Sequence, residues 1–177
     1  DNNIASVYGE GRGGGIVFAG HSISYNIISN NLASQMADGY GGGAWSYNAA
    51  HCTLGNNTFY HNANKGLGFA SGNGSGMYYW YGGYNFKMKN NIFMDHNVSG
   101  SDSVAIFSGE ALTNNWNNCF YNNGSNYNTN FTSHNDVLAN PQLTDPVNGI
   151  FTLLYNSPCI DAGADTMVYN QITNHAM

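Results

Sequence analysis

The chain has few charged residues. Only 8% of its 177 residues are Asp, Glu, Lys or Arg, against a typical share of about 25%. Four basic residues stand against ten acidic ones, so the net charge is −6. Binding to nucleic acid or to anionic lipid needs clustered basic side chains, and this composition excludes both functions.

Long apolar runs are also missing. No stretch approaches the roughly 18 apolar residues that cross a bilayer, so we expect no membrane insertion. Asn and Gly, which disfavour helix interiors, number 30 and 23, and this excludes a long helix or coiled coil. The chain is nevertheless 42% hydrophobic and 14% aromatic, which is more than a disordered chain carries.

Cysteine is scarce and its spacing is uninformative. Cys52, Cys119 and Cys159 allow at most one intrachain bridge with one thiol left over, and the pairing stays open. The absence of a C-x-x-C spacing excludes a zinc knuckle or a thioredoxin-like site. Few charges with abundant Tyr and Asn predict a secreted or cell-surface protein. The candidate glycosylation sequons begin at Asn56, Asn73, Asn97, Asn123 and Asn130.

Short apolar strands repeat along the chain. Four Asn-flanked apolar segments lie at residues 26–31, 57–62, 91–97 and 118–123, with starts 31, 34 and 27 residues apart. A Gly-led apolar strand precedes each of them, as at residues 13–18 and 41–46. Strands this short bury a face only when successive repeats stack, so the repeat indicates a solenoid.

Stacking of these repeats fixes the expected fold. Equivalent positions of successive coils lie about 4.8 Å apart. Asn tolerates the left-handed backbone of tight corners, and stacked Asn side chains can form a hydrogen-bonded ladder. The sequence therefore predicts an all-β fold, a right-handed parallel β-helix of about five to six rungs without an obvious capping helix. The expected inward-facing stack consists of Ile28, Phe59, Phe93 and Phe120.

We expect one domain over residues 1–177, with regular rungs at 13–123 and an irregular closing segment at 124–177. Solenoid ends usually carry caps because open coils expose unpaired strand edges. Neither end shows helix signals, and we expect no signal peptide within these residues. We therefore expect a part of a longer chain, or a subunit that self-associates head to tail into filaments.

The repeats resemble those of secreted bacterial β-helix proteins in the pectate-lyase-like superfamily. The pairing of Gly-Gly-Gly-Ile with Phe-x-x-Asn is also similar to polymorphic outer-membrane adhesins and autotransporter passengers. Residues 140–153 (NPQLTDPVNGIFTL) with residues 157–165 (SPCIDAGAD) resemble the closing segment of many large secreted β-helix proteins, with Cys159 in place of the usual Ala. The resemblance implies the fold but no single activity, since the superfamily includes lyases, hydrolases, adhesins and scaffolds.

Carbohydrate-active enzymes are one alternative function. A polysaccharide lyase needs Lys or Arg beside a uronate carboxylate, but Arg12 stands alone and Lys87 and Lys89 do not recur at stacked positions. A glycoside hydrolase needs two close carboxylates, and the acidic residues are spread over different turns. We predict no catalytic residues and keep a lyase or glycosidase domain, whole or truncated, as the alternative.

Two metal sites are candidates. In the repeat alignment His61 and His96 fall at equivalent positions, within about 5–6 Å on adjacent coils. Together with Asp95 they suit a transition metal, although a stacked polar ladder is the simpler interpretation. Calcium is the second candidate, bound by oxygen ligands in the turns around Asp95, Asn97 and Asp102. No other cofactor is expected.

The most aromatic stretch lies at residues 77–84. Strand alternation places Tyr79 and Tyr81 on one face and Trp80 on the other, while Trp45 and Tyr47 lie at a similar phase one repeat earlier. An exposed aromatic patch can stack on sugar rings or on a neighbouring subunit, unless the loop 63–75 covers it. The candidate glycan-contacting residues are Trp45, Tyr47, Tyr79, Trp80 and Tyr81.

These observations favour a non-catalytic extracellular module that is structural or adhesive and that self-assembles into filaments. The alternatives are the carbohydrate-active enzyme and a glycan-binding module that uses the aromatic residues.

Overall fold

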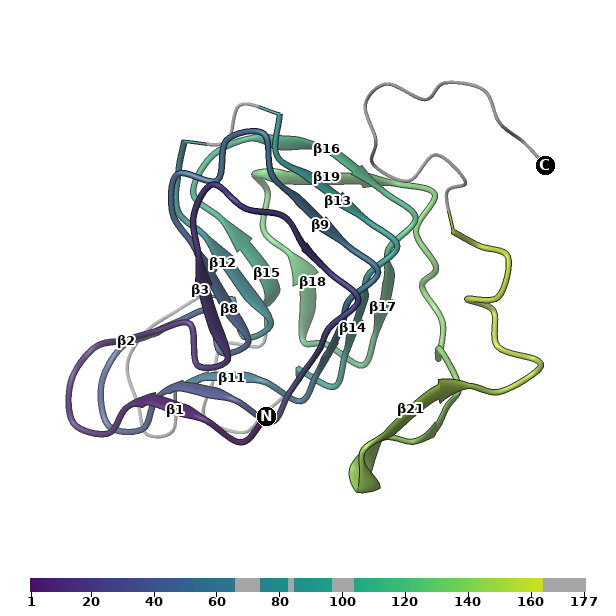
Figure 1. Ribbon diagram of the computed structural model, residues 1–177, viewed down its shortest axis with the longest axis horizontal. Coiled ribbons are helices and arrows are strands. Elements are labelled where there is room, and N and C mark those ends of the chain that lie inside the picture. The colour runs from purple at the N-terminus through teal and green to yellow at the C-terminus, as the bar shows by residue number, and fades with distance from the viewer. Residues whose placement is uncertain (66–73, 83–84, 97–103, 164–177) are drawn as a thin grey trace.

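The computed structural model describes residues 1–65, 74–82, 85–96 and 104–163. In these residues three parallel sheets run along a coil, and the chain adds one strand to each sheet in turn (Figure 1). Sheet I contains β3 (Ile16–Phe18), β8 (Ala44–Ser46), β12 (Met77–Tyr79), β15 (Val104–Ser108) and β18 (Ser125–Tyr127). Sheet II contains β4 (Ile23–Ser24), β9 (Thr53–Gly55), β13 (Lys87–Lys89), β16 (Leu112–Trp116) and β19 (Phe131–His134). Sheet III contains β5 (Ile27–Ser29), β10 (Thr58–Tyr60), β14 (Ile92–Met94) and β17 (Cys119–Tyr121).

A side sheet and a strand pair extend one corner of the coil. The side sheet contains β1 (Ile4–Ser6), β6 (Leu32–Ser34) and β11 (Ala63–Lys65), and the pair contains β2 (Gly11–Arg12) and β7 (Gly39–Tyr40). All of these pairs are parallel, which confirms the predicted parallel β-helix, and sheets I and II have five strands each. Among the described strands parallel pairing runs from β1 to β19, and an isolated parallel bridge joins Cys119 to Val137.

The predicted inward stack forms the centre of the core. Phe59 pairs with Ile28 on one side and with Phe93 on the other, and Phe93 pairs with Phe120. The Phe59 and Phe93 rings stack with centroids 4.6 Å apart, and the Phe93 and Phe120 rings follow at 5.4 Å. These four side chains are buried. Each buried aromatic side chain stabilises the fold by about 1.5–3 kcal/mol.

The chain turns from sheet II to sheet III through a two-residue corner. The first corner residue takes a positive φ, for example 55° at Asn56, 57° at Asn90 and 57° at Asn117. Asn adopts this left-handed conformation at a lower energetic cost than most residues, which explains why it recurs there. The second corner residue points inward and forms the first ladder, whose members are Asn26, Asn57, Asn91, Asn118 and Asp136.

The ladder satisfies the hydrogen-bonding groups of its buried amides. Both the backbone N–H and the Nδ2 of Asn57 donate to Oδ1 of Asn91, at 3.0 and 3.1 Å. Nδ2 of Asn91 also donates to the carbonyl oxygen of Leu54 at 2.9 Å. A second ladder of the same geometry separates sheet III from the side sheet, and its members are Asn3, Asn31, Asn62, His96 and Asn123. The predicted asparagine ladder is therefore confirmed.

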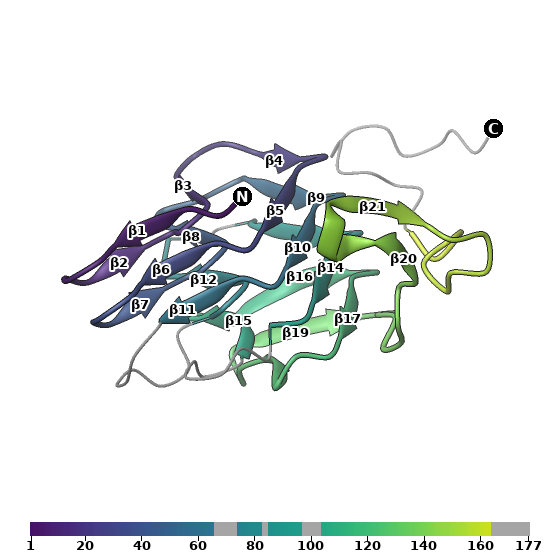
Figure 2. The same cartoon turned by 90° about the horizontal axis from the view of Figure 1, so that it is seen from below.

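Residues 125–134 of the expected closing segment still belong to the coil as β18 and β19, whereas residues 140–163, called the closing segment from here on, fold back outside it. In the closing segment, strands β20 (Leu143–Asp145) and β21 (Ile150–Leu153) form an antiparallel hairpin around the short 3-10 helix η1 (Pro146–Asn148). The hairpin packs on the outer face of sheet III, where Leu143 joins Tyr60 and Met94 in a second apolar cluster. Figure 2 shows β20 and β21 beside β10 and β14. The described residues contain no capping helix, and none of their helices is long and apolar enough to cross a bilayer.

Candidate functional site

An aromatic column lies on the outer face of sheet I. Residues alternate between the two faces of a strand, so the neighbours of the buried Met77 and Tyr79 point outward. The parallel register places Trp45 between Val17 and Tyr78, and Tyr78 beside Phe107. The rings of Tyr78 and Phe107 stack at 5.0 Å with planes 8° apart. Three adjacent strands of this sheet, β8, β12 and β15, therefore carry aromatic side chains on the outer face.

Further rings widen this surface into a groove. Trp80 stacks on Tyr78 at 5.8 Å, and Tyr40 from β7 meets Tyr78 edge to face at 5.2 Å. Tyr47 stacks on Trp45 at 5.8 Å with an interplanar angle of 11°. The resulting aromatic groove has a volume of about 460 Å³ and is lined by Glu10, Arg12, Tyr40, Trp45, Tyr47, Tyr78 and Trp80.

A charged pair lies along one side of the groove. The Arg12 guanidinium lies 5.3 Å from the centroid of the Trp45 ring and forms an ion pair with Glu10 at 2.6 Å. Burial raises the pKa of Tyr78 to about 12 and, with the nearby Glu10, also raises the pKa of Tyr40. Both phenols therefore keep their protons at neutral pH. The groove offers hydrogen-bond donors and one carboxylate beside flat apolar rings.

Most of the predicted aromatic residues come together here. Trp45, Tyr47 and Trp80 line the groove, and Tyr81 extends it through a hydrogen bond between its hydroxyl and that of Tyr47. The prediction that Tyr79 contacts a glycan is wrong, because its side chain lies in the core and is 0% exposed. Alternation keeps Tyr79 inside with Met77, whereas the chain turns after β12 and leaves Tyr81 at the surface.

Sequence reasoning missed the groove residues that come from β2, β7 and the loop before β2. Glu10, Arg12 and Tyr40 reach the aromatic column because β2 pairs with β7 beside sheet I. Only the pairing of Gly11 with Gly39 and of Arg12 with Tyr40 brings them to the site. No signal in residues 77–84 could have identified these partners.

The register of the structure differs from the one expected for the candidate metal site. Tyr60 pairs with Met94, so His61 corresponds to Asp95, and His96 corresponds to Asn62. The alignment was therefore one residue out of register, and His61 and His96 do not stack. The described residues contain no group of three or more His, Cys, Asp or Glu side chains that could hold a metal ion. Asn97 and Asp102 of the calcium candidate lie outside the described residues.

His96 is a member of the second ladder rather than a surface ligand. Its backbone N–H donates to Oδ1 of Asn123 at 3.1 Å, and its Nδ1 lies 3.0 Å from the same oxygen. On the other side Nδ2 of Asn62 lies 3.5 Å from Nε2. Burial lowers the pKa of His96 to about 3, so the ring is neutral at physiological pH. A neutral imidazole both donates and accepts, which allows it to replace an amide in the ladder.

The glycosylation sequons lie in different surroundings. Asn130 is exposed. Asn123 is engaged in the second ladder, where its Nδ2 donates to the Phe93 carbonyl oxygen at 3.0 Å, so a glycan on this nitrogen would remove that bond. Asn56 lines the cavity under the closing segment. Asn73 and Asn97 lie outside the described residues.

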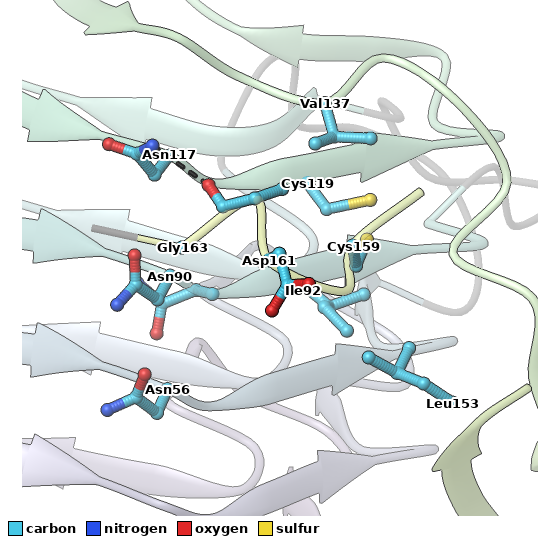
Figure 3. Close-up of a pocket in the computed structure, with 12 residues that line it drawn as sticks. Asn56, Asn90, Ile92, Asn117, Cys119, Val137, Leu153, Cys159, Asp161 and Gly163 are labelled. Atoms are coloured by element: carbon cyan, nitrogen blue, oxygen red, sulfur yellow. Dashed lines mark hydrogen bonds between the residues drawn. The ribbon is translucent and has the colours of Figure 1, made fainter. Parts of the chain in front are cut away.

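A second cavity lies between the sheet II–III corner and the closing segment (Figure 3). Its volume is about 590 Å³. Asn56, Asn90 and Asn117 form a row of side chains along one wall, and Asp161 lies on the opposite side. Nδ2 of Asn117 donates to the carbonyl oxygen of Ala162 at 2.9 Å. This bond holds the closing segment against the corner. The cavity is therefore a space between these two packed parts of the chain.

Comparison with protein-family models, curated proteins and solved structures finds no match for this chain. The arguments for function therefore rest on the geometry of the aromatic groove.

Proposed function

We propose that this protein is a non-catalytic extracellular adhesive module that binds carbohydrate through the aromatic groove. The observation that carries the proposal is the exposed Trp80 ring, 45% accessible, beside Trp45 and the Arg12–Glu10 pair. Sugar rings present apolar C–H faces that stack on aromatic rings, and their hydroxyl groups hydrogen-bond to charged side chains at the rim. The groove combines both features on a rigid sheet.

The chemistry of the groove supports binding over cleavage. Among the described residues that line it, Glu10 is the one carboxylate, and it is paired with Arg12. Hydrolysis of a glycosidic bond uses two carboxyl groups. The elimination catalysed by lyases needs a base, and the raised pKa values of Tyr40 and Tyr78 make both phenols poor bases at neutral pH.

The proposal includes membership of the pectate-lyase-like superfamily and a secreted or cell-surface location. The repeats and the closing motif at residues 140–165 support this membership, and parallel coils with buried asparagine ladders are compatible with it. A low content of charged residues supports the extracellular location.

Calorimetric titration with neutral and uronate oligosaccharides tests the proposal. We expect binding without turnover by the unmodified protein, and a loss of roughly tenfold or more in affinity for Trp80→Ala, because stacking area is removed. Tyr155→Ala is the matched control, since Tyr155 is 93% exposed and lies outside the groove. Equal affinity of the two variants, or no binding to any oligosaccharide, would contradict the proposal. Formation of shortened or unsaturated sugars would establish the enzyme alternative.

Head-to-tail self-association is a second candidate function. Strands β1, β3 and β5 are the terminal strands of their sheets, and their side chains Ile4, Val17 and Ile27 are 49–55% exposed. A second copy stacked in the same direction would continue the parallel pairing and cover these side chains. Sedimentation velocity at increasing concentration and electron microscopy test this. Filaments or growing oligomers are expected, and one monomeric species at every concentration would contradict self-association.

A further inference from the structure

Two of the three cysteines meet on the outer face of sheet III. Cys119 is the first residue of β17 and is 3% exposed, while Cys159 lies half-buried in the closing segment. Both line the second cavity, where Figure 3 shows their side chains, and each thiol shifts the pKa of the other, which requires the two sulfur atoms to be close. Residues 40 positions apart in the sequence therefore present two sulfur atoms to each other.

The surrounding backbone holds both cysteines in place. Phe120 points into the core, so its neighbour Cys119 points outward toward the closing segment. On the other side Oγ of Ser157 donates to the carbonyl oxygen of Pro141 at 2.5 Å and accepts from the Cys159 N–H at 3.1 Å. The Asn117 bond to Ala162 anchors the segment beyond Cys159. These contacts hold the backbone at both cysteines and so keep the two thiols near each other.

The two thiols differ in acidity and in access. Interaction with Cys119 lowers the pKa of Cys159, whereas interaction with Cys159, together with burial, raises the pKa of Cys119. The Cys119 Sγ donates to the carbonyl oxygen of Ala139 at 3.5 Å. Cys159 is also the more exposed of the two. An accessible thiol of lowered pKa beside a buried partner is the arrangement in which one sulfur attacks and the other resolves.

We propose that Cys119 and Cys159 form a reversible disulfide that fastens the closing segment to the last strand of sheet III. The oxidant is a small-molecule disulfide. The Cys159 thiolate attacks one of its sulfur atoms, which forms a mixed disulfide and releases one thiolate. Cys119 then loses its proton and attacks the Cys159 sulfur, which releases the second thiolate. Two protein thiols are oxidised, and the oxidant is reduced to two thiols that carry the protons away.

Cys52 provides an internal control. It is 2% exposed, and its Sγ donates to the carbonyl oxygen of Ala50. Burial raises the pKa of this thiol. It belongs to neither the second cavity nor the Cys119–Cys159 pair. Cys52 should therefore stay reduced when the other two cysteines are oxidised.

The experiment treats the whole chain with oxidised glutathione, followed by mass spectrometry under denaturing conditions with alkylation of free thiols. We expect the folded protein to lose two hydrogens and to keep one alkylatable thiol, at Cys52. The Tm should rise by roughly 5–10 °C, because the crosslink restricts the unfolded chain. Cys52→Ser should also lose two hydrogens and show the same rise in Tm, but it should keep no alkylatable thiol. Cys159→Ser should show neither the loss of two hydrogens nor the rise in Tm.

Three results would overturn the proposal. One is a stable mixed disulfide at Cys159, which would show that Cys119 does not reach it. A second is a covalent dimer, which would show that Cys159 faces another molecule. The third is complete resistance of all thiols to oxidation while the protein is folded. A control checks that the Cys159→Ser variant folds: its Tm should equal that of the parent protein when both are reduced.

Discussion

The two faces of sheet I show how one set of strands serves two purposes. On the inner face Met77 and Tyr79 are completely buried and pack in the core that runs through every coil. On the outer face Trp45, Tyr78 and Trp80 form a groove with a charged rim. The inner positions obey the repeat, because each must stack on its equivalents above and below. The outer positions Trp45, Tyr78 and Phe107 also lie in register, but they face away from the core, and we propose that carbohydrate binds on this side.

The largest loss in the free energy of unfolding should come from removing one ring of the inner stack. Phe93→Ala removes the ring that stacks on both Phe59 and Phe120, and we expect it to lower the free energy of unfolding by about 3–5 kcal/mol. Urea denaturation measures this loss. The matched change on the outer face is Phe107→Ala, where the ring stacks on Tyr78 at the partly exposed surface. Equal losses for the two variants would remove the distinction between the faces.

The next effect concerns the first ladder. Asn91→Ala removes the acceptor of the buried Asn57 N–H and a donor to the Leu54 carbonyl oxygen, whereas Oδ1 of Asn118 keeps the Asn91 backbone N–H. We expect a loss of about 2–4 kcal/mol in the free energy of unfolding, since unsatisfied buried polar groups are costly. Thr113→Ala, at an exposed position of sheet II, should change it by less than about 0.5 kcal/mol. Similar denaturation midpoints for both variants would show that the ladder contributes little.

A pH effect distinguishes the two ladders. The pKa of His96 is about 3 in the folded protein, below its usual value of 6.5, so only the unfolded chain takes up a proton between these values. Stability should fall as the pH drops from 6.5 toward 3, by at most about 1.4 kcal/mol per pH unit. His96→Asn restores an amide at this position and should remove that part of the slope. Parallel stability–pH curves for the two proteins would contradict the buried neutral imidazole.

The smallest effect concerns a hydroxyl group on the inner face. The Tyr79 hydroxyl is buried and has no hydrogen-bond partner among the described residues. Tyr79→Phe should therefore leave the protein equally stable or stabilise it by up to about 1 kcal/mol. Thermal unfolding measures the change. Destabilisation by more than this would mean that the hydroxyl has a partner after all.

The sequence predicted the parts of the fold that repeat. The spacing of the Asn-flanked segments identified the column of Ile28, Phe59, Phe93 and Phe120, because stacking forces equivalent positions into contact. It failed at His96, where an imidazole replaces an amide in the ladder and shifts the apparent alignment by one residue.

The groove was only partly predictable. Alternation grouped Tyr79 with Tyr81, but it did not reveal that the chain turns after Tyr79 and leaves Tyr81 at the surface. Arg12 and Tyr40 belong to the site through the pairing of β2 with β7, which follows no repeated pattern in the sequence. Sequence periodicity does not predict pairing between distant strands that lie outside the repeat.

Heteronuclear NMR of the three tryptophan indole N–H groups tests the central claim most directly. Trp45 and Trp80 lie in the groove, whereas Trp116 lies on sheet II beneath the Lys89 ammonium. On titration with the oligosaccharide of highest affinity, the account predicts that the Trp45 and Trp80 signals shift in a saturable way while Trp116 stays unchanged. A shift confined to Trp116, or no shift of any indole signal, would contradict carbohydrate binding in the aromatic groove.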